Sequence, residues 1–355
     1  MHRALRLAER GRGSTAPNPM VGAVIVDDDG VVVGDGYHER AGLPHAEVRA
    51  LDAAGDRARG ATLYCTLEPC CHTGRTGPCV ERIAAAGVRH VVAATIDPNP
   101  RVSGAGIASL RARGVRVTVG VAGRDAVRQN VAFFTRMRAR RPFVLAKAAV
   151  SLDGYIAARP GVRTNISGRS ARRAVQRTRA EVDALGIGVG TLVVDDPLLT
   201  VREVYRTRPL MRVVFDRGLR TPPTARLLAT TDHGPVIVLT SEAALNAQAA
   251  RADALRAAGA RLEVPGDGGI PSALGRLADL GVSSLLLEGG ACLHAAAWDA
   301  RMIDRVQLYV SPLALGESGV PAFGGRSFAV RDLHDLRVEP CGDDVLIEGD
   351  VHRLD

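Results

Sequence analysis

Short apolar runs alternate with amphipathic segments along the first part of the chain. The runs with the length and composition of strands lie at 21–26, 31–33, 61–67, 91–95 and 115–119. Segments with the apolar spacing of helices lie at 45–54, 79–86, 107–113 and 125–140. This alternation predicts a sheet with helices packed on its faces.

A second alternation begins at Phe143. Strands are expected at 143–147, 184–189, 211–215, 236–240, 284–287, 305–310 and 345–347. Helices are expected near 170–183, 243–258 and 271–280. No internal repeat relates the two halves. The sequence therefore predicts two different α/β domains, at residues 1–141 and 142–355, with a connecting helix at about 125–140.

The composition agrees with a globular protein of two domains. The chain has 355 residues, of which 46% are apolar and 24% charged, and this excludes a disordered or fibrous chain. No apolar run approaches the roughly 20 residues that span a bilayer, and the first residues lack the apolar core of a secretion signal. We therefore expect a soluble cytoplasmic protein with no membrane partner.

The positive charge of the chain comes almost entirely from arginine. Lys and Arg number 46 against 38 Asp and Glu, a net charge of +8, and Lys147 is the only lysine. Dispersed arginine indicates a solvated surface or an anionic ligand such as a phosphate ester. Aromatic residues make up only 3% of the chain, so platforms for stacking single-stranded bases are scarce and no nucleic-acid partner is expected.

Four of the six cysteines lie close together, at 65, 70, 71 and 79. In a cytosolic protein such a cluster indicates metal binding or catalysis rather than disulfides. His45 and Glu47 lie on one predicted helix, Cys70 follows a strand and Cys79 begins the next helix. A His-x-Glu motif followed by two such cysteines is the pattern of zinc deaminases.

This pattern predicts a Zn²⁺ site with His45, Cys70 and Cys79 as ligands and a fourth position open to water. Glu47 would take a proton from that water and pass it to the leaving amine. The alternative is a structural zinc, which would need a fourth protein ligand, and His72 or Cys71 could supply it.

The segment between the two cysteines is longer than the two residues of the short deaminase signature. It reads Cys71-His72-Thr73-Gly74-Arg75-Thr76-Gly77-Pro78. It resembles the same segment of the bifunctional deaminase/reductase family of riboflavin biosynthesis, with Gly77 where a proline is common. Segments similar to that family's substrate loops lie at 15–22, 34–38, 41–47 and 97–100. The resemblance extends over essentially the whole chain.

For the first domain, the resemblance implies a cytidine-deaminase-like three-layer fold. It implies zinc-dependent hydrolytic deamination of 2,5-diamino-6-(ribosylamino)pyrimidinone 5′-phosphate, a small phosphorylated pyrimidine. It implies the same zinc ligands and Glu47 as the proton shuttle. The substrate contacts that it implies are Asn18, His72 and Arg75.

In the second half, candidate residues follow three apolar segments. Lys147 lies at a strand end, and a compact ammonium there has properties that arginine cannot imitate. Asp195 begins an Asp-Asp-Pro run, which by itself indicates a capped turn. Glu288 precedes two glycines and a predicted helix, an arrangement that lets a phosphate approach backbone N–H groups.

For this domain, the resemblance implies a dihydrofolate-reductase-like fold and NADPH-dependent reduction of the ribosyl group to ribityl. The catalytic residues that it implies are Lys147, Asp195 and Glu288. The cofactor contacts are Ala149, Asn165, Thr191, Asp195, Arg217, Gly290, Ala291, Cys292, Leu293, His294, Ala295 and Ala296. The substrate contacts are Arg163, Arg179, Leu199, Arg202 and Glu288.

The chain departs from the family pattern near the expected cofactor. Arg163 and Asn165 stand where Ser and Trp are usual, and Arg217 replaces a serine. Arg217 would contact the 2′-phosphate of NADPH or lie in a solvated turn. Without the aromatic ring of the Trp, one alternative is a protein whose deaminase is active and whose reductase is silent.

Two further alternatives for the function remain open. One is a deaminase of nucleic acids or nucleosides whose second domain has another role. Another is a non-catalytic binding protein with a structural zinc. The chain is also expected to form a homo-oligomer if the strand at 304–311 pairs with a second copy.

Overall fold

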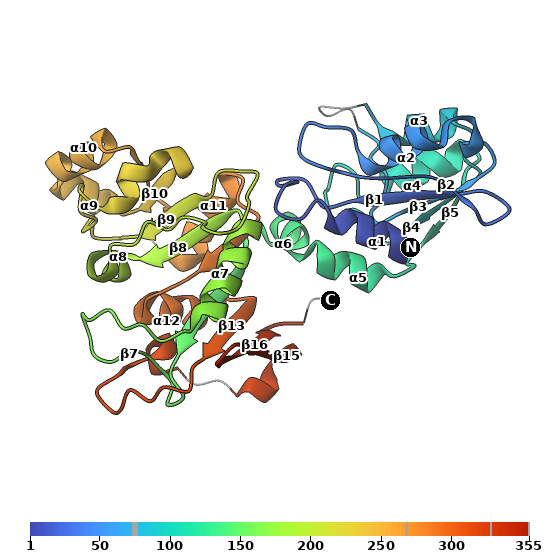
Figure 1. Cartoon of the computed structure of the whole chain (residues 1–355). Coiled ribbons are helices and arrows are strands. Elements are labelled where there is room, and N and C mark those ends of the chain that lie inside the picture. Colours follow the sequence, from blue (N-terminus) through green and yellow to red (C-terminus); the bar gives the residue numbers. More distant parts are fainter. Residues whose placement is uncertain (73–76, 267–268, 327–328, 354–355) are drawn as a thin grey trace. The chain divides into compact units, whose positions relative to one another are not determined.

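The computed structural model describes residues 1–72, 77–266, 269–326 and 329–353 (Figure 1). The chain divides into two compact units, Met1–Arg140 and Arg141–Asp355. Within the described residues, no helix has the length and apolar character needed to cross a membrane.

The first unit is built on one mixed sheet with the strand order β2-β1-β3-β4-β5. Its strands are β1 (Gly22–Val26), β2 (Val32–Tyr37), β3 (Thr62–Cys65), β4 (His90–Ala93) and β5 (Arg116–Val119). β1 pairs antiparallel with β2 and β3, whereas β3, β4 and β5 are mutually parallel. The carboxyl ends of the parallel strands therefore meet at one edge of the sheet, which in such sheets is where ligands bind.

Helices cover both faces of this sheet (Figure 1). They are α1 (His2–Glu9), α2 (Ala46–Ala54), α3 (Cys79–Ala85), α4 (Ala105–Ala112), α5 (Gly123–Gln129) and α6 (Val131–Ala139), with a 3-10 turn η1 (Gly55–Ala58). α2, α3 and α4 lie on one face and α1 on the other. α2 lies so close to β2 that a Cβ on Gly34 would come within 2.3 Å of the carbonyl oxygen of Ala50. Glycine at this position therefore allows the helix to pack directly on the strand.

The second unit contains a larger, mostly parallel sheet with the order β11-β10-β9-β8-β12-β6-β13-β16-β15. Its strands are β6 (Phe143–Val150), β8 (Ala184–Gly188), β9 (Met211–Phe215), β10 (Val236–Leu239), β11 (Ala260–Glu263), β12 (Ser284–Leu287), β13 (Arg305–Val310), β15 (His334–Cys341) and β16 (Asp344–Asp350). β16 runs antiparallel to both of its neighbours, β13 and β15, and the other pairs of adjacent strands in this sheet are parallel. A separate small ladder joins β7 (Tyr155–Ala157) to β14 (Val320–Pro321).

The helices of this unit are α7 (Arg169–Glu181), α8 (Val189–Asp195), α9 (Glu242–Ala247), α10 (Ala249–Ala257), α11 (Ile270–Asp279) and α12 (Ala291–Asp299). The 3-10 segments are η2 (Arg226–His233), η3 (Ala322–Gly325) and η4 (Val330–Asp332). α11 and α12 pack on the main core face of the sheet, where Ala146 and Leu287 are buried. α7 packs its Ala171 and Val175 against Tyr309 of β13.

Three predictions from the sequence are wrong in detail. The expected helix at 125–140 is broken at Asn130, whose side chain bonds the backbone of Met20 instead of facing solvent. The expected helix at 243–258 is likewise broken, at Gln248, whose amide donates to the carbonyl oxygen of Gly218. β13 pairs with β6 on one side and β16 on the other, so its edges are not available to a second copy.

Candidate functional site

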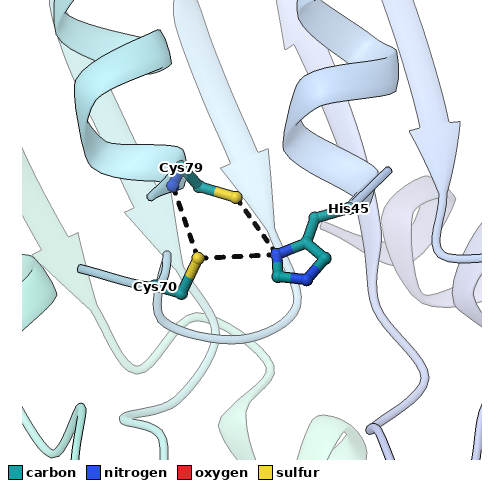
Figure 2. Close-up of side chains that lie close together, drawn as sticks. All are labelled: His45, Cys70 and Cys79. Atoms are coloured by element: carbon teal, nitrogen blue, oxygen red, sulfur yellow. Dashed lines mark hydrogen bonds between the residues drawn. The ribbon is translucent and has the colours of Figure 1, made fainter. Parts of the chain in front are cut away.

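In the first unit, His45, Cys70 and Cys79 come together from three different segments (Figure 2). His45 is the residue just before α2, Cys70 lies in the loop after β3, and Cys79 is the first residue of α3. His45 Nδ1 is 3.3 Å from Cys79 Sγ and 3.5 Å from Cys70 Sγ. One ligand atom from each residue lies within 4.8 Å of the other two.

The backbone at the start of α3 fixes the two cysteines relative to each other. Pro78 precedes the helix in an extended conformation, and the N–H of Cys79 donates to Cys70 Sγ over 3.3 Å. A hydrogen bond from Cys79 lowers the pKa of the Cys70 thiol to about 4, and the same contact raises the pKa of Cys79. One sulfur of the pair is therefore held as the thiolate, which is the form that binds metal.

This donor set fits zinc. One imidazole and two thiolates are the three protein ligands of a catalytic zinc site that keeps its fourth position open. Within the described residues, the group includes neither Cys71 nor His72, either of which could have closed a structural site. The Cys71 thiol instead points to the carbonyl oxygen of Arg101, 4.0 Å away.

The group opens on a cavity of about 340 Å³. Glu47, in the first turn of α2, lines this cavity and is only 3% exposed. Burial raises the pKa of Glu47 to about 7. A buried carboxyl beside the metal ligands and facing the cavity is placed to exchange protons with a molecule bound there.

The predicted substrate residues of this unit are partly brought together. Asn18 and His72 line the same cavity. The buried Nδ1 of His72 has no hydrogen-bond partner among the described residues, so it is available to a ligand. Arg75 lies outside the described residues.

The cavity is also lined by polar residues for which sequence analysis predicted no individual role. His38 Nε2 accepts a hydrogen bond from Asn18 Nδ2 at 3.1 Å, and His38 Nδ1 lies 3.3 Å from the carbonyl oxygen of Pro44. Asp97 is 8% exposed, and burial raises its pKa to about 6. Glu68 is the third such residue. In the sequence, these three residues are marked only as polar side chains close to apolar strands. That pattern is too common in proteins to identify cavity residues.

In the second unit, Lys147 and Glu288 lie side by side on neighbouring strands. Glu288 directly follows β12, but the expectation that Lys147 lies at a strand end is wrong, because β6 continues through it to Val150 and Lys147 pairs with Gln307 of β13. β6 and β12 are parallel with Ala146 opposite Leu287, so the next residue on each chain is Lys147 or Glu288. Arg179 of α7 donates to both carboxylate oxygens of Glu288, at 2.5 and 2.7 Å. The structure therefore joins the predicted substrate residue Arg179 to a predicted catalytic residue.

The charges of this group are interdependent. Burial alone would raise the pKa of Glu288, but Arg179 and Lys147 lower it below its ordinary value. Burial lowers the pKa of Lys147, and Glu288 opposes that shift. The Lys147 ammonium also lies 6.0 Å from the centre of the Tyr309 ring. Glu288 is thus a carboxylate held between two cations.

The turn after Glu288 packs against the start of α8. The N–H of Gly188 donates to the carbonyl oxygen of Gly289 over 3.3 Å. Gly290 has a φ of 78°, and a Cβ on it would lie 2.9 Å from Thr191 Oγ1. The predicted cofactor residues Thr191 and Gly290 are therefore adjacent, in front of the N-terminus of α12. Free N–H groups at a helix start after a parallel strand fit a phosphate of a dinucleotide.

The other predicted cofactor residues on α12 differ in exposure. Ala291 is half-buried, Cys292 and Ala296 are exposed, and Leu293, His294 and Ala295 are buried. His294 stacks on Phe323 and bonds the carbonyl oxygen of Leu287 through Nε2. The side chains of the three buried residues therefore belong to the core, and only their backbone is available to a cofactor.

The remaining predicted residues are more dispersed. Asp195 ends α8, where burial raises its pKa and Arg163 opposes the shift. No hydrogen bond or ion pair within the described part of the chain links it to Lys147 or Glu288. Exposed positions are occupied by Arg163, Asn165, Arg202 and Arg217, whereas Leu199 is buried and Ala149 half-buried. Asp195 is in a helix end rather than in the capped turn that its sequence suggested.

Comparisons with known proteins find relatives of both halves of the chain. The family model "Cytidine and deoxycytidylate deaminase zinc-binding region" matches residues 1–95, and "RibD C-terminal domain" matches residues 142–347. The chain is 38% identical to "Riboflavin biosynthesis protein RibD" of Aquifex aeolicus, over 98% of this chain and 96% of that protein.

Two solved structures cover nearly the whole chain. Acinetobacter baumannii RibD is 35% identical with a TM-score of 0.85, over 98% of this chain and 97% of that one. A diaminohydroxyphosphoribosylaminopyrimidine deaminase/5-amino-6-(5-phosphoribosylamino)uracil reductase of Thermotoga maritima is 33% identical with a TM-score of 0.82, over 99% and 97% of the two chains.

Proposed function

The chain belongs to the RibD family of bifunctional riboflavin-biosynthesis enzymes, and from that premise we propose where each of its two reactions takes place. It is a zinc-dependent deaminase of a phosphorylated diaminopyrimidinone and an NADPH-dependent reductase that converts the ribosyl group to ribityl. Its fold combines a cytidine-deaminase-like domain with a dihydrofolate-reductase-like domain. We assign deamination to residues 1–141 and reduction to residues 142–355.

The proposed zinc ligands are His45, Cys70 and Cys79. The observation that carries this assignment is their convergence within 4.8 Å at the wall of a cavity. Bound zinc supplies Lewis acidity that makes water a nucleophile near neutral pH. Glu47 takes the proton of the attacking water on its carboxylate and delivers it to the leaving amino nitrogen.

The proposed pyrimidine subsite is the rest of that cavity. Asn18 and His72 line it, and each presents a polar atom that a ring substituent or ribose hydroxyl can bond. Arg75 is proposed to meet the phosphate ester, because a guanidinium donates two parallel bonds to phosphate.

The proposed reductase centre is the group of Lys147, Glu288 and Arg179, with Asp195 at its margin. NADPH, when bound, supplies the hydride. Lys147 and Arg179 place positive charge where the ribosyl oxygen gains electron density. Glu288 orients Arg179 through their ion pair and balances the charge of the nearby Lys147. Arg163, Leu199 and Arg202 are the further proposed substrate contacts.

The proposed cofactor site is centred on Gly290 and Thr191. The N–H groups at the start of α12 would hold a phosphate of NADPH. The remaining proposed contacts are Ala149, Asn165, Asp195, Arg217, Ala291, Cys292, Leu293, His294, Ala295 and Ala296. The absence of the usual Trp at Asn165 is expected to weaken the nicotinamide contact without removing the phosphate site.

Removing zinc with a chelator should stop NADPH oxidation when the diaminopyrimidinone substrate is supplied, because the reductase then receives no deaminated intermediate. Absorbance of NADPH measures this directly. The already deaminated intermediate should still consume NADPH in the zinc-free protein, which serves as the control. The zinc assignment would be contradicted if metal analysis shows that zinc is lost and NADPH is still oxidised at the full rate with the diaminopyrimidinone substrate.

We also propose a cytoplasmic homo-oligomer. Cysteine ligands bind zinc as free thiolates, and the cytoplasm keeps cysteines in the reduced form. β15 forms one edge of the large sheet among the described strands and exposes Leu336 and Val338, so a second copy could add there. Light scattering should find a multiple of the chain mass for the wild type and a smaller mass for Val338→Lys. A monomeric wild type would reject this proposal.

A further inference from the structure

Glu68 is a buried carboxylate beside the deaminase cavity that has no role so far. It lies in the loop between β3 and Cys70 and is 3% exposed. Its own N–H donates to the carbonyl oxygen of Thr95 over 3.0 Å. A carboxylate is rarely buried to this degree unless it is paired or hydrogen-bonded.

The side chain of Glu68 accepts three backbone hydrogen bonds. Oε2 accepts from the N–H of Asp97 at 3.1 Å and of Gly104 at 2.9 Å. Oε1 accepts from the N–H of Ile107 at 3.1 Å. Gly104 and Ile107 belong to the start of α4, where backbone N–H groups have no partner inside the helix. The carboxylate of Glu68 therefore caps α4 from a distant segment of the chain.

These bonds connect the two sides of the deaminase cavity. Cys70, two residues after Glu68, lines the cavity on the metal side. Asp97 and Asn99 line it too, and Asp97 Oδ1 accepts the N–H of Asn99 at 2.8 Å. Glu68 is bonded to the backbone of this second loop, so its carboxylate determines how far the loop lies from Cys70.

α4 packs tightly against the segment from Glu68 to Cys70, so neither can shift without moving the other. A Cβ on Gly106 would lie 2.1 Å from the carbonyl oxygen of Pro69 and 3.1 Å from Glu68 Oε1. The helix backbone is thus in direct contact with the segment that leads to Cys70. A shift of the Glu68 carboxylate must move either this segment or the loop at Asp97.

We propose that Glu68 is a positioning residue of the deaminase, which holds the loop of Asp97 and Asn99 at the right distance from the zinc ligand Cys70. In this role it acts through the backbone of the loop, not through a bond to the metal. This inference rests on the proposed zinc centre and adds a residue to it.

The chemistry of the contact explains why a carboxylate is needed. Three N–H donors converge on it, and an ionised carboxylate is an acceptor at both oxygens. A glutamine would turn an NH₂ group toward at least one of these donors and could satisfy two at most. The negative charge also favours the N-terminus of α4.

The test compares Glu68→Gln and Glu68→Ala with a matched control in the full chain. The control is Asp27→Ala, because Asp27 also accepts two backbone N–H bonds, from Asp29 and Val31, but lies in the turn between β1 and β2. Zinc content, KM and kcat for deamination are measured. The absorption of the Co²⁺-substituted proteins reports the thiolate ligand set.

Glu68→Gln is expected to raise KM for the pyrimidine about tenfold, with a smaller change in kcat, because a charge-assisted bond to the loop is lost. Glu68→Ala should have a larger effect. The Co²⁺ absorption and zinc content of Glu68→Gln should match the wild type, and Asp27→Ala should leave both kinetic constants per bound zinc unchanged.

Two results would overturn the inference. One is a Glu68→Gln protein whose KM and kcat per bound zinc equal those of the wild type. This includes a protein that binds less zinc but is otherwise unchanged. The other is an equal rise of KM in Asp27→Ala, which would mean a general loss of stability. Failure of the proposed function is distinguishable, because the wild type itself would then lack zinc-dependent deamination.

Discussion

Replacing Glu47 with glutamine is expected to lower the rate of deamination by about 10²–10⁴-fold and to leave zinc bound. Glutamine has the same shape, but its amide cannot take a proton from water and return it to the leaving nitrogen. Glu47 is not among the three grouped ligands, so the metal should stay. The rate of deamination and the zinc content of the purified variant are the measurements.

Asp52→Asn is the matched control for this change. Asp52 is on the same helix, but it is exposed and bonds Arg82 at 2.6 Å, so its variant should deaminate at the wild-type rate. Both variants should oxidise NADPH normally when given the deaminated intermediate. A Glu47→Gln protein that keeps its zinc and its full rate would show that another group moves the proton.

The sequence was sufficient to predict the α/β fold class and the parts of the sheets that are buried. Expected strands at 211–215 and 284–287 coincide with β9 and β12, because each is a largely apolar run inside the parallel part of the sheet. The expected strand at 305–310 coincides with β13, where apolar and polar residues are mixed. β15 was not predicted. Its residues are nearly all exposed, so no apolar alternation marks it.

Helix breaks and long-range contacts are the features that the sequence could not supply. The break at Asn130 arises because its amide bonds the N–H and carbonyl oxygen of Met20, a residue far away in the chain. The same holds for Glu68, whose three partners lie in segments that follow it at a distance. Such contacts depend on the finished fold and leave no local pattern.

The two candidate centres differ in how far residue types alone could lead. In the deaminase, His and Cys are such specific zinc ligands that their spacing predicted a group which the fold then brings together. In the reductase, an isolated Lys or Glu has many ordinary roles. Lys147 and Glu288 become adjacent only because β6 and β12 are neighbours in the sheet, which the sequence pattern does not specify.

Replacing Lys147 with methionine is expected to slow NADPH oxidation by about 10²–10³-fold, the usual effect of losing one electrostatic group from a reaction centre. Methionine keeps the length and apolar contacts of the chain beside Tyr309 but removes the ammonium near Glu288. Lys147→Arg should also be slow, because a planar guanidinium does not replace a compact ammonium in a half-buried position. Oxidation of NADPH with the deaminated intermediate measures both variants.

Deamination should be unchanged in Lys147→Met, and so should NADPH oxidation in Arg256→Met, which removes an exposed charge from α10. A comparison of Lys147→Met with Arg179→Met shows which of the two cations acts on the substrate. Arg179 donates to both oxygens of Glu288 and so already neutralises that carboxylate without Lys147. If Lys147→Met keeps the wild-type rate while Arg179→Met loses it, the cation that acts on the ribosyl oxygen is Arg179, and Lys147 only balances the charge of Glu288.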